Sequence, residues 1–102
     1  MQNLEVQFTA SAYEDLDRIT DYLIERDMNA ARSTYDRLIV AVKHLSKFPL
    51  MGVMMEAYEL RTWGHRKLIV DDFAVIYRIF DDAVVIYHIF NQRQDYGKIF
   101  DK

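Results

Sequence analysis

The chain has 102 residues, of which 51% are hydrophobic and 28% charged, the balance of a folded protein rather than a disordered one. It contains no cysteine, which excludes a disulfide framework, a thiolate zinc site and a thiol nucleophile. Its net charge of −3 argues against broad binding to nucleic-acid phosphates. We expect a single domain over residues 1–102.

The same sequence gives expectations for location and for local charge. Residues 1–8 lack a sustained apolar region, and no apolar run approaches the roughly 20 residues that span a bilayer, so we expect a cytoplasmic protein without a membrane partner. The excess of acidic groups lies in residues 1–57. A basic cluster in the second half could form a local anion-binding patch, and its members are Arg61, His65, Arg66 and Lys67.

The first elements in chain order are a strand and a helix. Residues 4–8 alternate apolar and polar side chains, as in a half-buried strand. Thr9 or Ser11 can cap the following helix, and Ser11 with Glu14 has capping-box spacing. Helical periodicity predicts an amphipathic helix that ends near residues 26–27, with its apolar stripe at Ala12, Leu16, Ile19 and Leu23.

A second helix follows almost immediately. Asn29 is its expected N-cap, and Pro49 disfavours helical backbone at Phe48, so the helix ends there. Because only residues 27–29 separate the two helices, they must fold back as a hairpin. The apolar positions of this helix step by three and four residues, at Ala31, Tyr35, Leu38, Val42 and Leu45.

The second half of the chain has the pattern of β-structure. Residues 49–57 are interpreted as a loop in which Gly52 marks a turn. Strands, or one bulged strand, are predicted at 58–63 and 65–70, followed by strands at 73–80 and 84–90; the acidic pairs at 71–72 and 81–82 form turns rather than metal sites. Strand 73–80 is apolar on both faces and should be central. The predicted fold is α+β: an N-terminal strand, an α-helical hairpin and an antiparallel sheet of three to four strands.

Several segments together resemble the RelE/ParE superfamily of bacterial toxins. Phe73–Ile79, Val84–Phe90 and the residues Arg93-Gln94-Asp95 are similar to its C-terminal signature, and Arg66–Val70 is similar to the segment before its central strand. A hairpin closed by Phe48-Pro49 resembles the ParE-like branch. The resemblance covers nearly the whole chain. It implies the toxin of a type II toxin–antitoxin module, of the plasmid-stabilisation or addiction kind.

The resemblance also implies partners. ParE-like members poison DNA gyrase, whereas RelE-like members cut mRNA in the ribosomal A site, and a cognate antitoxin wraps either kind with a partly disordered segment. We therefore expect an antitoxin, and either gyrase or the ribosome with mRNA, but no cofactor and no metal. A homodimer or a heterotetramer with the antitoxin is compatible with this.

If the chain is an enzyme, it is a metal-independent endoribonuclease. Such a reaction needs a base, an acid and cations that stabilise the phosphate. The resemblance places Lys67 and Arg93 at the family's Lys and C-terminal Arg positions, and Arg66 and Tyr96 are further candidates. Two departures from the RelE-like pattern favour gyrase binding over RNA cleavage. Ala74 and Ile99 stand where RelE-like nucleases carry Arg and Tyr.

Plain structural roles compete with these assignments. Arg66 and Lys67 are equally well explained as solvated residues on an edge strand. His88 is in phase with buried positions and should be a hydrogen-bonded histidine in or near the core, whereas His65 should be exposed. Arg93 carries the strongest functional expectation. Trp63 and Tyr77 are most simply packing residues.

Three hypotheses therefore remain: a toxin that binds gyrase, an mRNA endoribonuclease, and a member that binds an antitoxin without being toxic. All three predict a groove between the sheet and the helices that accepts an apolar antitoxin segment.

Overall fold

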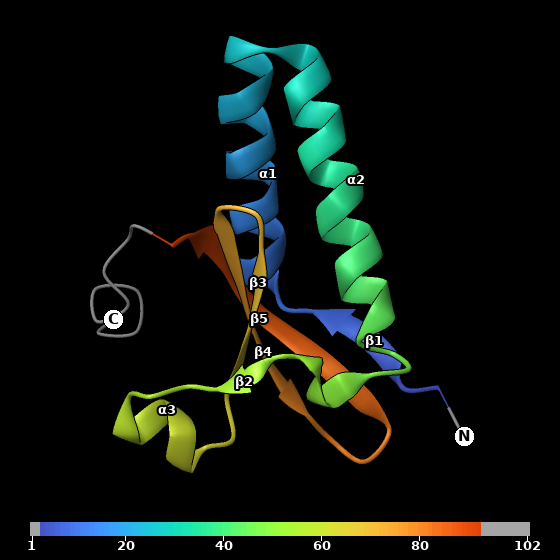
Figure 1. The fold of residues 1–102 in the computed structure, drawn as a ribbon, viewed down its shortest axis with the longest axis vertical. Helices are drawn as coiled ribbons and strands as arrows, with labels where there is room; N and C mark the ends of the chain where they lie inside the picture. The colour runs from blue at the N-terminus through green and yellow to red at the C-terminus, as the bar shows by residue number, and fades with distance from the viewer. Residues whose placement is uncertain (1–2, 93–102) are drawn as a thin grey trace.

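The computed structural model describes residues 3–92, and it confirms the α+β prediction. A helical hairpin packs on a twisted five-stranded sheet, and part of the hairpin extends beyond the sheet (Figure 1). The elements in chain order are β1 (Glu5–Phe8), α1 (Ala10–Arg26), α2 (Met28–His44), η1 (Pro49–Met51), β2 (Val53–Met54), α3 (Tyr58–Thr62), β3 (Arg66–Val70), β4 (Phe73–Ile79) and β5 (Ala83–Asn91).

The strands are ordered β1-β5-β4-β3-β2, so β4 is central, as predicted from its two apolar faces. The antiparallel pairs β3–β4 and β4–β5 form the predicted meander, and the short strand β2 pairs antiparallel with β3. The N-terminal strand joins the far edge by pairing parallel to β5, from Glu5 opposite Ala83 to Phe8 opposite Ile86. The antiparallel part of the sheet, β2 to β5, therefore has the four strands of the predicted upper limit, and the predicted N-terminal strand adds a fifth, parallel one.

Both long helices lie close to their predicted ranges, but their caps differ. The hydroxyl of Thr9 accepts a hydrogen bond from the amide of Ala12 at 3.1 Å, so Thr9, and not Ser11, caps α1. Asp27 caps α2 by accepting from the amides of Asn29 and Ala30, so the assignment of Asn29 as N-cap is wrong. Because Asp27 both ends α1 and begins α2, the hairpin has a very tight connection.

The prediction of a strand at residues 58–63 is wrong, because this segment forms the short helix α3. In α3, the backbone amide of Arg61 donates to the carbonyl of Ala57, and the hydroxyl of Thr62 donates to the carbonyl of Tyr58. The edge of β3 where another strand could pair is already taken by β2. Trp63 at the end of α3 is 60% exposed, so its assignment as a packing residue is also wrong.

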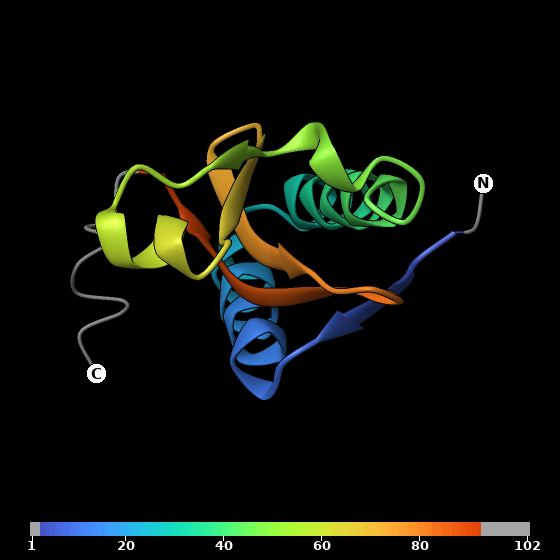
Figure 2. The ribbon, with the colours of Figure 1, turned by 90° about the horizontal axis from the view of Figure 1, so that it is seen from below.

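The core has two parts, one on each face of the sheet. On the helix-covered face, Leu16, Leu38 and Val42 pack against side chains from β3, β4 and β5. A smaller cluster on the other face contains Met55, Ala74, Ile76 and Phe90. Figure 2 shows both helices nearly end-on, with α3 at the other end of the molecule from the β1 edge.

A buried tyrosine fixes the segment before β2. The hydroxyl of Tyr77 accepts from the amide of Gly52 at 2.9 Å and donates to the carbonyl of Pro49 at 2.7 Å. A Cβ added at Gly52 would lie 2.7 Å from this hydroxyl and 2.8 Å from the carbonyl oxygen of Lys67. Gly52 is thus required by close approach, not by a turn that needs positive φ. Burial raises the pKa of Tyr77, although the Gly52 amide and nearby Arg66 partly oppose this.

Within residues 3–92, no helix combines the length and hydropathy needed to cross a membrane.

Candidate partner-binding groove

A groove of about 480 Å³ lies between the hairpin and the ends of the strands, as predicted. Its apolar lining comes from three elements, with Ile19 and Leu23 on α1, Phe73 at the start of β4 and Ile89 on β5. Its polar lining includes Arg18, Arg37, Asp71 and Asp72. The groove therefore offers an apolar floor between charged groups, which suits an amphipathic segment.

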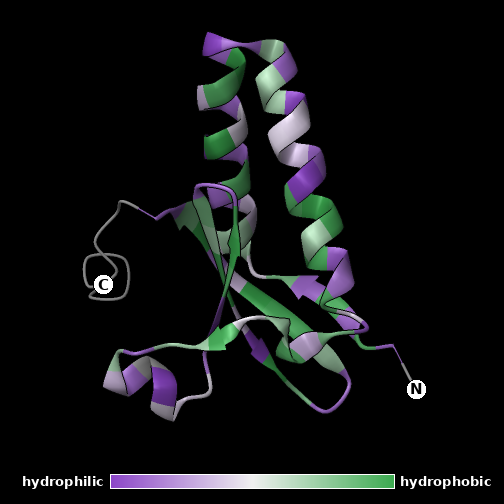
Figure 3. Cartoon of the chain, in the orientation of Figure 1, coloured by the Kyte–Doolittle hydropathy of each residue, from purple (hydrophilic) through white to green (hydrophobic). Residues whose placement is uncertain are grey.

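The groove exists because the hairpin is longer than the sheet beneath it. All buried residues of α1 lie in its first half, at Ala12, Asp15 and Leu16. Beyond them the helices extend past the sheet and still carry apolar bands, drawn green in Figure 3. Tyr22 on the groove wall is 54% exposed. An apolar stripe that continues past its covering layer leaves a surface suited to a partner.

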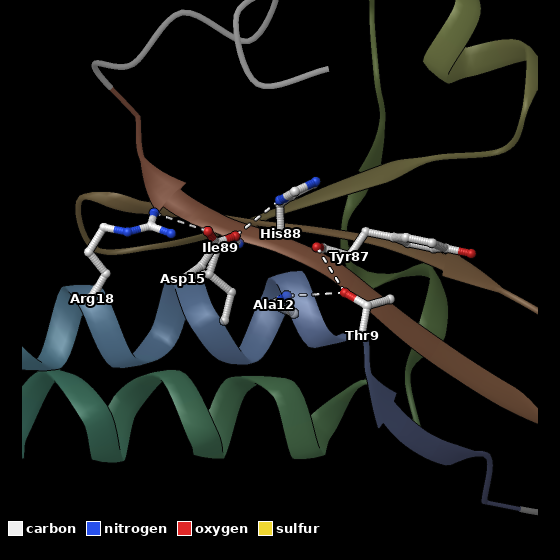
Figure 4. Close-up of polar contacts among 7 residues, drawn as sticks. All are labelled: Thr9, Ala12, Asp15, Arg18, Tyr87, His88 and Ile89. Atoms are coloured by element: carbon white, nitrogen blue, oxygen red, sulfur yellow. Dashed lines mark hydrogen bonds and ion pairs between the residues drawn. The ribbon is translucent and has the colours of Figure 1, made fainter. Parts of the chain in front are cut away.

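Asp15 joins α1 to β5 and contacts two residues that line the groove, Arg18 and Ile89 (Figure 4). One oxygen of its carboxylate accepts from the backbone amide of Ile89 at 3.0 Å and lies 3.1 Å from Nδ1 of His88. The other oxygen accepts from the guanidinium of Arg18 at 3.2 Å. The prediction of a hydrogen-bonded His88 is confirmed.

Several effects compete to set the pKa of Asp15. Burial is the largest and would raise the pKa. Its hydrogen bonds with His88 and with the Ile89 amide, together with the positive charges of His88 and Arg18, outweigh burial and hold the pKa below the ordinary value of 3.8. Asp15 is therefore a buried carboxylate that its surroundings keep charged.

The backbone of β5 is adapted to this contact. In the register between β4 and β5, Ile76 faces His88 and Tyr77 faces Ile86, so Tyr87 is an extra residue. Such a bulge redirects the neighbouring side chains and amides. Here it accompanies the contact that His88 and the Ile89 amide make with Asp15.

The opposite wall is held by an ion pair between α2 and the β3–β4 turn. The guanidinium of Arg37 donates to the carboxylate of Asp71 and also to the hydroxyl of Ser33. Asp71 has a φ of +55°, a left-handed conformation that Asp tolerates better than most residues. The side chain of Gln92 donates to the Asp71 carbonyl at 2.8 Å, which ties this turn to the end of β5.

Among the residues singled out from sequence, Arg66 and Lys67 are not brought into one cleft. Arg66 lies opposite Tyr77 on the helix-covered face, where its guanidinium donates to the carbonyl of Gly52 at 2.7 Å. Lys67 lies opposite Ile76, whose side chain belongs to the cluster on the other face. Arg93 and Tyr96 lie outside the described residues.

His65 is buried, with 6% of its surface exposed, so the expectation of an exposed His65 is wrong. Its ring lies 5.5 Å from that of Tyr87 and 6.3 Å from that of Trp63, between β5 and the end of α3. Within residues 3–92, no group of three or more His, Cys, Asp or Glu side chains is placed to hold a metal ion.

Sequence reasoning missed the residues that shape the groove, above all Asp15, Arg18 and Arg37. A signal was present for Asp15, because it falls on the same helical face as Ala12 and Ile19. A carboxylate on an apolar stripe requires a buried partner. No comparable signal in the sequence points to Arg18 or Arg37, which are two of several charged residues on exposed helix positions.

The sequence matches the family described as "ParE toxin of type II toxin-antitoxin system, parDE" over residues 6–96. Comparison with curated proteins gives no significant match. Among solved structures, the chain is similar to the chromosomal ParDE toxin–antitoxin system from P. aeruginosa, with a TM-score of 0.72 and 22% identity over 86% of this chain and 95% of that one.

Two further structures share the fold. The toxin–antitoxin complex RelBE2 from Mycobacterium tuberculosis gives a TM-score of 0.59 and 24% identity, over 88% of this chain and 99% of that one. YafQ from E. coli strain BL21(DE3) gives a TM-score of 0.51 and 16% identity, over 95% and 98% of the two chains. At these identities the likenesses establish the fold alone.

Proposed function

The chain belongs to the family of ParE toxins of type II toxin–antitoxin systems, and from this premise we propose that it arrests growth by binding DNA gyrase and is neutralised by a cognate antitoxin. The observation that carries the proposal is the hairpin that extends past the sheet. It offers helical surface to a large macromolecular target and a groove to a bound segment.

The outer part of the hairpin is our candidate for the gyrase contact. Here Ile24 is 41% exposed, Met28 59% and Tyr35 42%. Exposed apolar side chains on a protruding element are typical of protein–protein contacts. None of these three side chains lines the groove, so target and antitoxin would use neighbouring but different surfaces.

The groove is our candidate site for the antitoxin. An extended or helical segment could cover the apolar floor formed by Ile19, Leu23 and Phe73 while its polar side faces solvent. Such a segment would also bridge the hairpin and the β3–β4 turn. It would thereby restrict the approach of a large target to the hairpin.

Endoribonuclease activity remains the second candidate function. Its proposed catalytic residues are Lys67, Arg93 and Tyr96. The engagement of Arg66 with the carbonyl of Gly52 on the opposite face supports the gyrase reading, since it removes one proposed cation from the side of Lys67. Positioned cations are a large part of phosphate transition-state stabilisation.

The test is induction of the chain in a bacterial host without an antitoxin, with a DNA-damage-response reporter followed during growth arrest. Gyrase poisoning predicts an early reporter signal, and purified gyrase should accumulate cleaved DNA when the chain is added. Arrest with a silent reporter would favour the nuclease, and Arg93→Ala should then abolish mRNA cleavage. A folded chain that causes no arrest would point to an antitoxin-binding member without toxicity.

A pair of variants locates the contact with gyrase. Met28→Asp places a charge in the proposed contact and should abolish the reporter signal and gyrase-dependent DNA cleavage. Val40→Asp makes the same change at a comparably exposed position, at 53%, nearer the sheet-covered end of α2, and should leave both signals intact. Equal loss from both variants would contradict the proposed contact surface.

A further inference from the structure

Arg18 is the groove residue with the greatest unused capacity to bind an anion. Its side chain is 70% exposed and lines the groove, and a single hydrogen bond, 3.2 Å long, holds one of its nitrogens to Asp15. A guanidinium has five N–H donors in a planar fork. The remaining donors of Arg18 can therefore meet an acceptor in the groove.

Asp15 orients Arg18 without fully neutralising it. The carboxylate of Asp15 is shared among three donors, because it also accepts from the Ile89 amide and contacts His88. The side chain of Asp15 is only 12% exposed, so it offers Arg18 a fixed anchor. Because one nitrogen of the guanidinium is already held, less conformational entropy is lost when its other nitrogens bind a partner.

The second arginine of the groove has its charge already matched. Arg37 is paired with Asp71 and is also bonded to Ser33. Asp72 beside this pair adds a negative charge on the same wall. Among the charged residues that line the groove, Arg18 is the one from α1, whereas Asp71 and Asp72 lie at the β3–β4 turn, with apolar residues between them.

We propose that this groove selects a segment in which an Asp or Glu lies next to the apolar residues and binds the free face of Arg18. The inference rests on the proposed function, since the segment would belong to the antitoxin. It adds which charge the antitoxin segment must present and how that segment is oriented in the groove. The acidic residue faces α1, and any basic residue of the segment faces the turn at Asp71–Asp72.

The experiment uses the purified full-length chain and a phage-displayed library of short random segments as the probe. Segments are selected on the wild-type chain and counter-selected on Tyr22→Asp, which alters an exposed groove residue. The surviving segments should be enriched in Asp and Glu beside apolar positions. Each is then measured against Arg18→Glu by titration at low and high salt.

Arg18→Glu should weaken these segments about tenfold, equivalent to about 1.4 kcal/mol. The loss should shrink at high salt, because Arg18 is largely exposed. Replacing the acidic residue of a segment by Lys should restore its binding to Arg18→Glu. Arg32→Glu is the matched control, since Arg32 is exposed on α2 and does not line the groove, and it should leave affinity unchanged.

Two negative results have different meanings. Groove-specific segments that lack acidic enrichment and bind Arg18→Glu as tightly as the wild type would overturn the charge selection but leave the groove as an antitoxin site. If no segment distinguishes Tyr22→Asp from the wild type, the groove itself fails as a docking site, and the proposed antitoxin site fails with it.

Discussion

The two halves of the helical hairpin have the same amphipathic pattern but different surroundings. Where the hairpin covers the sheet, Leu16 and Leu38 are almost completely buried, at 6% and 1% exposure. In the half that extends past the sheet, Ala31 is buried, but the nearby apolar residues Leu23, Ile24 and Met28 are partly or fully exposed.

The difference shows that helical periodicity alone does not reveal what a helix packs against. In the covered half, apolar side chains gain stability by removal from water inside the chain. In the projecting half, the same kind of residue retains exposed surface that a partner can cover. The covered half should therefore dominate the stability of the fold, and the projecting half should dominate binding.

The largest expected effect comes from truncating the same residue type in each half. Leu38→Ala should lower the free energy of unfolding by about 2–5 kcal/mol, because it opens a cavity in a packed core. Leu23→Ala, at a half-buried position on the groove, should cost about 1 kcal/mol. Urea denaturation followed by circular dichroism measures both, and equal losses would remove the distinction between the halves.

Asp15→Asn tests the polar link between the covered hairpin and β5. Because the folded state lowers the pKa of Asp15, its charged form stabilises the fold above pH 3.8, and this contribution disappears as the pH falls through the lowered folded value. The variant should be less stable by about 1.5–3 kcal/mol at pH 7, as for a hydrogen bond to a charged group.

The gap between wild type and Asp15→Asn should then close in strong acid. Urea midpoints measured from neutral pH down to pH values below 3.8 would follow it. Asp17→Asn, on an exposed position of the same helix, is the control and should show little difference at any pH. A gap independent of pH would mean that the variant acts through packing rather than through the charge of Asp15.

Gly52→Ala tests the tightly packed segment between η1 and β2. The new Cβ would meet the Tyr77 hydroxyl and the Lys67 carbonyl, so stability should fall by about 1–3 kcal/mol. Gly64→Ala is an instructive comparison, because no atom lies within 4 Å of its added Cβ but its φ is +82°. That variant should lose only about 1 kcal/mol, from backbone strain.

Tyr77→Phe distinguishes steric from polar effects at Gly52. Removing the hydroxyl relieves the 2.7 Å contact of the added Cβ, although the one with the Lys67 carbonyl at 2.8 Å remains, and it leaves the Gly52 amide and the Pro49 carbonyl without this partner. Combining Gly52→Ala with Tyr77→Phe should therefore cost less than the sum of the separate losses. Additive losses in thermal or urea unfolding would contradict a direct clash with the Tyr77 hydroxyl.

The smallest expected effect concerns the ion pair on the groove wall. Arg37 and Asp71 are about half exposed, at 51% and 48%, so solvent screens their attraction. A double-mutant cycle with Arg37→Ala and Asp71→Ala should give a coupling below about 1 kcal/mol in stability. A larger coupling would show that the projecting half depends on this turn for its fold.

Much of the fold could be predicted because periodicity reports directly on local structure. The apolar stripes of the two helices, which include Leu16 and Leu38, predicted the hairpin. The two apolar faces of residues 73–80 identified the central strand. The helix at residues 58–62 could not be predicted from propensity, since Tyr58 and Trp63 favour strands. The edge of β3 is paired with β2 instead, and that long-range pairing cannot be read from local sequence.

The candidate site was less accessible from sequence. The groove was expected, but its charged residues were not, because Arg18 and Arg37 acquire their positions through packing of the hairpin against β5 and the β3–β4 turn. Arg66 and Lys67 were grouped because they are adjacent in the chain. Adjacent residues of a strand point to opposite faces, so the strand itself separates them.

The parallel pairing of β1 with β5 has a consequence for synthesis. Residues 5–8 leave the ribosome well before their partners at residues 83–86 have been made. The hydrogen bond between Asp15 and the Ile89 amide likewise cannot form until Ile89 has been made. The complete sheet and the groove can therefore assemble only after residues 83–91 have been made, and a chain that stops before them would lack both. An inhibitor already present in the cell would meet the groove as it first forms.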